Sequence, residues 1–154
     1  MWTLLHRVHH WWRADPSRRI SAGRARERVA RGAAYLDDAD PGWYRRVDPQ
    51  TLSLSSGRHC VLGQLHGEFR LGLGRSHLVS MSSAPRASLS PVAYGFKCVE
   101  GVPPEWQNRD YDLLTEAWTE AVRTRQANDP IISDEERGAP SGDAEAPAEP
   151  MPSA

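Results

Sequence analysis

Apolar residues in the first third of the chain recur with a helical period. Between residues 22 and 37, a spacing of three to four residues is followed by Ala25, Val29, Ala33 and Leu36. This spacing places them on one face of a helix, where they can pack on a core. Ser21 directly precedes the pattern and can accept a hydrogen bond from a free amide of the first turn. The sequence therefore predicts a helix over residues 22–37.

A similar stripe occupies the last strongly apolar part of the chain. It is formed by Leu114, Trp118, Ala121 and Val122. Either Asn108 or Asp110 can cap the helix that carries this stripe. We therefore expect a helix that begins at one of these two residues and ends near residue 126.

The stretch over residues 58–74 (RHCVLGQLHGEFRLGLG) fits both a helix and a strand. Its apolar side chains recur every four residues, but those at odd positions also alternate with polar ones. We favour a helix over residues 58–70 that is broken from Gly72 onwards. Ser55 or Ser56 is its expected cap.

Within this stretch, Gly63 and Gly67 are about one helical turn apart, so that they share a face of the predicted helix. Because neither residue has a side chain, another part of the chain can approach the helix closely there. We predict a tight packing contact at this pair.

The connections between the predicted helices differ in character. Trp43 and Tyr44 are expected to form a short aromatic turn after the first helix. Residues 76–91 hold six serines and two prolines, which is typical of a mobile loop. Residues 92–99 (VAYGFKCV) are predicted to form a short strand or an extended segment laid on the core.

The run CVLGQLHGEF at residues 60–69 is the most distinctive motif of the chain. It follows RVARGAAYLD at residues 28–37 and GWYRRVD at residues 42–48. Together these segments resemble a group of small uncharacterised proteins from actinobacteria and their phages, over about residues 25–126. The resemblance implies a genuine folded domain and an accessory role in a phage or mobile element. It assigns no site residue.

A chain of 154 residues with 39% hydrophobic content can form one modest core. We predict a mainly α fold, with a small single helical domain over residues 22–126 and an N-terminal arm over residues 1–21. Residues 127–154 hold seven acidic residues, one arginine and few hydrophobic ones. This composition predicts a disordered acidic tail.

Positive charge is concentrated in the first part of the chain, where residues 1–60 hold eleven arginines and six acidic residues. Arg24, Arg28 and Arg31 recur at helical spacing beside the first apolar stripe. Their guanidinium groups can neutralise phosphates, which suits nucleic acid as a partner. The alternative is a solvated face, since Glu27 stands four residues before Arg31 and can pair with it. Three further arginines add to the positive field: Arg18, Arg19 and Arg26.

Sequence motifs of several enzyme classes are missing. The chain contains no GxxxxGK[ST], GxGxxG, GxSxG or HExxH pattern, and these are the usual signatures of phosphate loops, dinucleotide sites, esterases and zinc proteases. Two histidines and two cysteines lack the short paired spacing of zinc sites. They are His59, Cys60, His66 and Cys98. We therefore predict no catalytic residue, no metal site and no cofactor, although an enzyme without a recognisable motif is a further alternative.

No stretch is apolar and long enough for a signal peptide or a membrane span. We expect a cytoplasmic protein whose two cysteines are reduced. The favoured function is a non-enzymatic interaction protein that binds an unidentified host protein, with Trp43 and Tyr44 as aromatic anchors. The alternative is a nucleic-acid-binding accessory protein that uses Arg24, Arg28 and Arg31.

Overall fold

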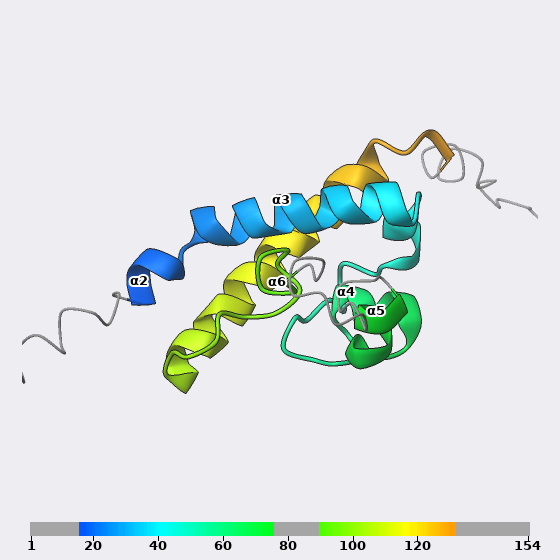
Figure 1. Ribbon diagram of the computed structural model, residues 1–154. Helices are drawn as coiled ribbons and strands as arrows, with labels where there is room; N and C mark the ends of the chain where they lie inside the picture. The colour runs from blue at the N-terminus through cyan, green and yellow to red at the C-terminus, as the bar shows by residue number, and fades with distance from the viewer. Residues whose placement is uncertain (1–15, 76–89, 132–154) are drawn as a thin grey trace, which may run out of the picture.

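The computed structural model describes residues 16–75 and 90–131, and in these ranges the chain is helical without a strand. Two long helices, α3 (Ala22–Ala39) and α6 (Pro104–Ala127), cross and pack against each other (Figure 1). The shorter elements are α2 (Pro16–Arg19), the 3-10 helix η1 (Trp43–Arg46), α4 (Val61–His66) and α5 (Phe69–Arg75). The predicted mainly α, single-domain fold is confirmed.

Helix α3 forms where the first apolar stripe predicts it. Ser21 caps the helix, because its Oγ accepts a hydrogen bond from the Arg24 amide at 3.3 Å. All four residues of the predicted stripe are buried in the core. The helix runs two residues further than expected, and Gly42 then turns the chain into η1 with a φ of 81°. This left-handed conformation favours glycine.

Helix α6 begins at Pro104, earlier than either predicted start. Proline is tolerated in the first turn because the amide it lacks has no partner inside the helix. The stripe around Leu114 and Trp118 is buried as predicted. Asp110, which was one of the two expected caps, instead lies inside the helix and is fully buried.

The helix predicted in residues 58–70 is confirmed as helix, but its bounds and cap are wrong. The chain breaks at Gly67, whose φ is 89°, and α5 then runs through Gly72. The cap is Cys60, whose Sγ accepts a hydrogen bond from the Gly63 amide at 3.3 Å. Neither predicted serine serves this purpose, because the helix starts later than expected.

The predicted close contact is confirmed for Gly63 and wrong for Gly67. A Cβ atom on Gly63 would lie 2.4 Å from the carbonyl oxygen of Gly57. At Gly67 the space is open, and glycine is needed there for the left-handed turn. Gly72 makes the second tight contact, since a Cβ there would lie 2.6 Å from the Cβ of Leu62.

The predicted segment over residues 92–99 does not form a strand: it is a turn over residues 92–95 followed by irregular chain. It nevertheless lies on the core as expected, because Phe96 is buried and stacks on Trp118 with 5.1 Å between ring centroids. Trp118 Nε1 also donates to the Gly95 carbonyl at 2.7 Å. At Gly32 of α3 a Cβ would lie only 2.1 Å from the Tyr94 carbonyl oxygen, so the segment sits directly against the helix backbone.

The packed structure extends past the predicted domain limits at both ends. Ile20 is buried before α3, and Asp129 is buried after α6. The predicted mobile loop lies outside the described residues except for Ser90 and Pro91, as do most of the predicted arm and tail.

Within the described ranges, no helix is both long and apolar enough to cross a membrane.

Candidate functional site

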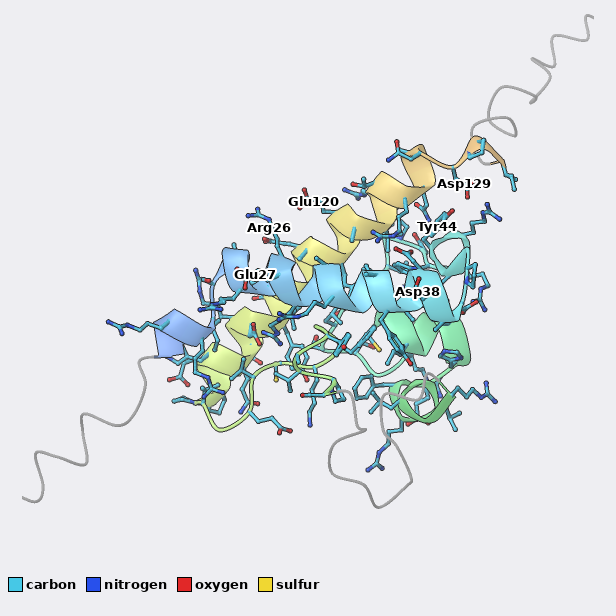
Figure 2. The ribbon with its side chains drawn as sticks, turned by 45° about the horizontal axis from the view of Figure 1, so that its top comes forward. Arg26, Glu27, Asp38, Tyr44, Glu120 and Asp129 are labelled. Carbon is cyan, nitrogen blue, oxygen red and sulfur yellow. The ribbon has the colours of Figure 1, made fainter. Side chains whose placement is uncertain are left out.

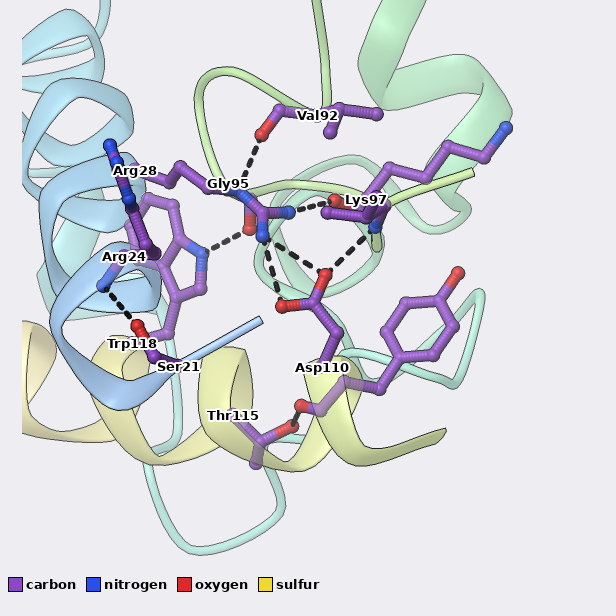
Figure 3. Close-up of polar contacts among 11 residues, drawn as sticks. Ser21, Arg24, Arg28, Val92, Gly95, Lys97, Asp110, Thr115 and Trp118 are labelled. Carbon is purple, nitrogen blue, oxygen red and sulfur yellow. Dashed lines mark hydrogen bonds and ion pairs between the residues drawn. The ribbon is translucent and has the colours of Figure 1, made fainter. Parts of the chain in front are cut away.

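The three arginines of the predicted binding face do not share one surface. Arg24 and Arg31 are exposed, whereas Arg28 is only 6% exposed. Arg28 Nη1 donates to both carboxylate oxygens of Asp110, at 2.9 and 3.0 Å (Figure 3). The prediction that Arg28 shares a binding face with Arg24 and Arg31 is therefore wrong. The physical reason is its position next to Val29 on the face of α3 that packs on α6 and residues 92–99.

The Arg28 guanidinium holds three parts of the chain together. Its Nε donates to the Val92 carbonyl at 2.7 Å and its Nη2 to the Lys97 carbonyl at 2.6 Å. The Asp110 carboxylate in turn accepts from the Val99 amide at 2.8 Å. Because breaking a buried, fully hydrogen-bonded pair by removing one partner typically costs about 3–5 kcal/mol, this cluster is a structural one.

Trp43 belongs to a second structural cluster and is fully buried. Its Nε1 donates to Asp37 Oδ1 at 2.8 Å, and Arg125 Nη2 donates to Asp37 Oδ2 at 2.7 Å. Hydrogen bonds from Arg125 and Trp43 hold the pKa of Asp37 below its ordinary value. Trp43 is therefore not accessible to a partner as the predicted anchor. Tyr44 keeps partial exposure and remains accessible.

The exposed positions of α2 and the first half of α3 carry a set of arginines that we call the arginine surface. Its members are Arg18, Arg19, Arg24, Arg26 and Arg31. Between residues 16 and 34 the only acidic residue is Glu27. Since Arg28 is neutralised internally by Asp110, these five arginines determine the charge of this surface.

The ion pairs within the arginine surface are long and solvated. Arg24 Nη1 lies 3.5 Å from Glu27 Oε2, and Arg26 Nε lies 3.8 Å from Glu120 Oε2. Figure 2 shows Arg26 and Glu120 extending into solvent from neighbouring helices. All four side chains are at least 60% exposed. Pairs of this kind contribute between nothing and about 1 kcal/mol and can be exchanged for an external anion.

The remaining members of the arginine surface have weaker internal partners. Arg31 Nε donates to the Ala93 carbonyl at 3.1 Å, a neutral acceptor. Within the described ranges, neither Arg18 nor Arg19 pairs with a carboxylate. The arginine surface is thus a concentration of positive charge that the other described residues leave largely uncompensated.

The opposite end of α3 is acidic, and there the fold does provide counter-charges. Arg125 of α6 binds Asp37, and Arg46 of η1 binds Asp40. The helix macrodipole favours acids in the first turn and bases in the last, whereas α3 has neither. The charges of α3 therefore run against its dipole, and the close ion pairs lie at its carboxyl end, on Asp37 and the C-cap Asp40.

A hollow of about 590 Å³ lies beside the break between α4 and α5. It is lined by Arg58, His59, Glu68 and Leu71 together with small residues, and Leu71 is 51% exposed. Ser56 Oγ lies 3.1 Å from His59 Nδ1 but also accepts from the His59 amide at 3.2 Å. The serine and histidine thus form a local turn, which accounts for their proximity.

The histidines and cysteines considered as metal ligands are not assembled into a site. In residues 16–75 and 90–131, no group of three or more histidine, cysteine or acidic side chains is placed to hold a metal. Cys60 acts as a helix cap, and burial raises the pKa of its thiol. Cys98 is likewise buried and free.

The residue that sequence reasoning missed is Asp110, the partner of Arg28. The two are separated by 82 positions, so no local pattern connects them. One signal was available: Asp110 stands four and eight residues before Leu114 and Trp118, which puts an aspartate on the buried stripe of α6. A charge at such a position requires a buried partner.

Comparisons with known proteins give no match: no family model, curated protein or solved structure corresponds to the chain. The function is therefore inferred from the residues and geometry described above.

Proposed function

We propose that this protein is a non-enzymatic interaction protein that binds a negatively charged partner through the arginine surface. The observation that carries the proposal is the asymmetry of α3. Asp37 of α3 and its C-cap Asp40 are paired by arginines from other elements, and exposed Asp38 between them is not paired by any described arginine. Among the described residues, the exposed arginines at the start of α3 have long, solvated or neutral contacts. Such guanidinium groups can bind an external anion without breaking an interaction on which the fold depends.

The buried groups with reactive potential have roles in stability. Arg28 and Asp110 satisfy each other and the backbone of residues 92–99. Cys60 caps α4, and the raised pKa of its thiol disfavours the thiolate that nucleophilic chemistry needs. These assignments support binding over catalysis as the function.

The test is retention on immobilised heparin, a generic polyanion. The wild-type protein should be retained, and the variant Arg18→Gln/Arg24→Gln/Arg31→Gln should elute at clearly lower salt, because ion-pair binding weakens as salt rises. The matched control is Arg58→Gln/Arg70→Gln/Arg75→Gln, which removes the same charge from exposed positions around α4 and α5. Equal loss of retention in both variants would mean that net charge alone matters, and would overturn the proposal.

A protein partner is a second candidate, and one observation favours it. Leu71 is exposed at a hollow with a polar rim, an arrangement that occurs in small protein-binding sites. Leu71→Asp should then abolish capture of a protein from an actinobacterial lysate while leaving heparin retention unchanged. Identical capture by the variant and the wild type would eliminate this site.

A further inference from the structure

We infer that the anionic partner of the arginine surface is the phosphate backbone of a nucleic acid, an inference that rests on the proposed function. An acidic protein is the competing class of partner. The two classes of partner require different side chains around the arginines.

Apart from Glu27, the exposed residues between the arginines are small. They are Ser21, Ala22, Gly23 and Ala30. Among the described residues, the large hydrophobic side chains with high exposure are Leu71 and Ile131, and both lie outside α2 and α3. A protein interface usually combines arginine with aromatic or aliphatic anchors that become buried at its centre. The arginine surface offers no such anchor, whereas its small residues let a phosphate backbone come close to the helix.

The spacing of the arginines suits a repeating anion. Arg24 and Arg31 are seven residues apart, which places them on one side of α3 and about 10 Å apart along its axis. Successive phosphates of one DNA strand advance by roughly 3.4 Å along the duplex axis. The two arginines can therefore each contact a different phosphate of the same strand, and Arg18 of α2 extends the array beyond the start of α3.

The dipole of α3 adds to the positive field of the arginine surface. Arg24 lies in the first turn, where the partial positive charge of the helix dipole reinforces the guanidinium field. Phosphate contacts of this kind carry no information about base identity. We therefore expect binding that is independent of sequence and strongly dependent on salt.

The experiment is a titration of the full chain with a short fluorescent DNA duplex at several salt concentrations. The logarithm of the affinity should fall linearly with the logarithm of the salt concentration. In Arg18→Gln/Arg24→Gln/Arg31→Gln the slope should become shallower by about two to three units, as expected for three lost phosphate contacts. The control Arg58→Gln/Arg70→Gln/Arg75→Gln should keep the wild-type slope.

Competition with poly-L-glutamate separates the two classes of partner. At equal charge concentration it should displace little of the duplex. Displacement as effective as that by unlabelled duplex would overturn the nucleic-acid inference and leave the proposed function intact, because an acidic polypeptide is also an anionic partner. Failure to bind the duplex at low salt, together with retention on heparin, would also overturn the nucleic-acid inference and leave the proposed function intact. If the protein bound neither heparin, the duplex nor poly-L-glutamate, both the nucleic-acid inference and the proposed function would be overturned.

Discussion

At the third position of α3, Arg24 adds positive charge to the arginine surface but stabilises the helix less than other residue types would. Arg24 donates its backbone amide to the Ser21 cap. A glutamate or glutamine at this position would return a hydrogen bond to the cap residue and complete a capping box. An arginine cannot accept that bond, and its charge opposes the helix dipole.

This arrangement predicts a variant that gains stability while it loses binding. Arg24→Gln should raise the free energy of unfolding by about 0.3–1 kcal/mol, since it removes the unfavourable charge and supplies the capping group. The lost pair with Glu27 is exposed and offsets little of this gain. Urea unfolding measures the change, and Arg58→Gln, in an exposed turn, serves as the neutral control. A clear loss of stability in Arg24→Gln would contradict the argument.

The role of an individual residue could be predicted where its contacts are close in sequence, and could not where they are distant. Ser21 was predictable as a cap because the cap and the amide it binds are three residues apart. Arg28 looked equivalent to its exposed neighbours, because its burial depends on Asp110 and on residues 92–99, far along the chain. Trp43 was similarly predicted as a surface anchor, because its contacts with Arg125 and Trp118 of α6 are distant in sequence.

Among the elements, the long periodic helices were predictable and the α4–α5 pair only in part. The apolar stripes of α3 and α6 extend over several turns, so their helical period is clear. In the α4–α5 region several glycines compete as the breaking point. Gly67 breaks the helix with a φ of 89°, whereas Gly72 is held inside α5 against Leu62. That difference is tertiary and has no local sequence signature.

The contact between α4 and the preceding turn leads to a prediction about glycine. Gly63→Ala should lower the free energy of unfolding by about 1–3 kcal/mol, because the new methyl group would meet the carbonyl oxygens of Gly57 and Arg58 at 2.4 and 2.6 Å. Gly74→Ala in α5 is the matched control.

A Cβ on Gly74 has no neighbour within 4 Å, so alanine should be neutral or stabilise by up to about 1 kcal/mol. Thermal and urea unfolding of the two variants give the comparison. Equal stability of the two alanine variants would show that α4 does not approach the turn this closely.

For the molecule as a whole, the packed structure continues beyond α6 to a buried charge. Asp129 is 1% exposed, and its Oδ1 accepts from Arg45 Nη2 and from the Ile131 amide, each at 3.0 Å. The sequence predicted that the tail begins after residue 126, because the composition changes there. A single buried aspartate within an acidic segment is not distinguishable by composition.

Two truncated chains test this boundary. The chain that ends at residue 131 should melt like the full-length protein, whereas the chain that ends at residue 126 should melt at lower temperature because Arg45 loses its partner. The hydrogen bond from Arg45 holds the pKa of Asp129 below its ordinary value. Its stabilising contribution is therefore present above about pH 4 and disappears as the pH falls through the lowered pKa.

The difference in melting temperature between the two chains should accordingly shrink as the solution is made strongly acidic. A difference that is absent at neutral pH would place the boundary at residue 126 after all. One that persists unchanged in acid would assign the effect to packing of residues 127–131 and not to the ion pair.

The attachment of residues 92–99 has a consequence for the order of events during folding. The segment contains no helix or strand, and Arg28 of α3 and Trp118 of α6 fasten it to the two long helices. We expect it to dock after these helices have met, on the native side of the rate-limiting barrier. In Arg28→Met/Asp110→Leu, unfolding should therefore become faster while refolding keeps its wild-type rate. Stopped-flow measurements in urea give both rates. A slower refolding of the variant would contradict the prediction, because it would mean that the segment is already docked in the transition state.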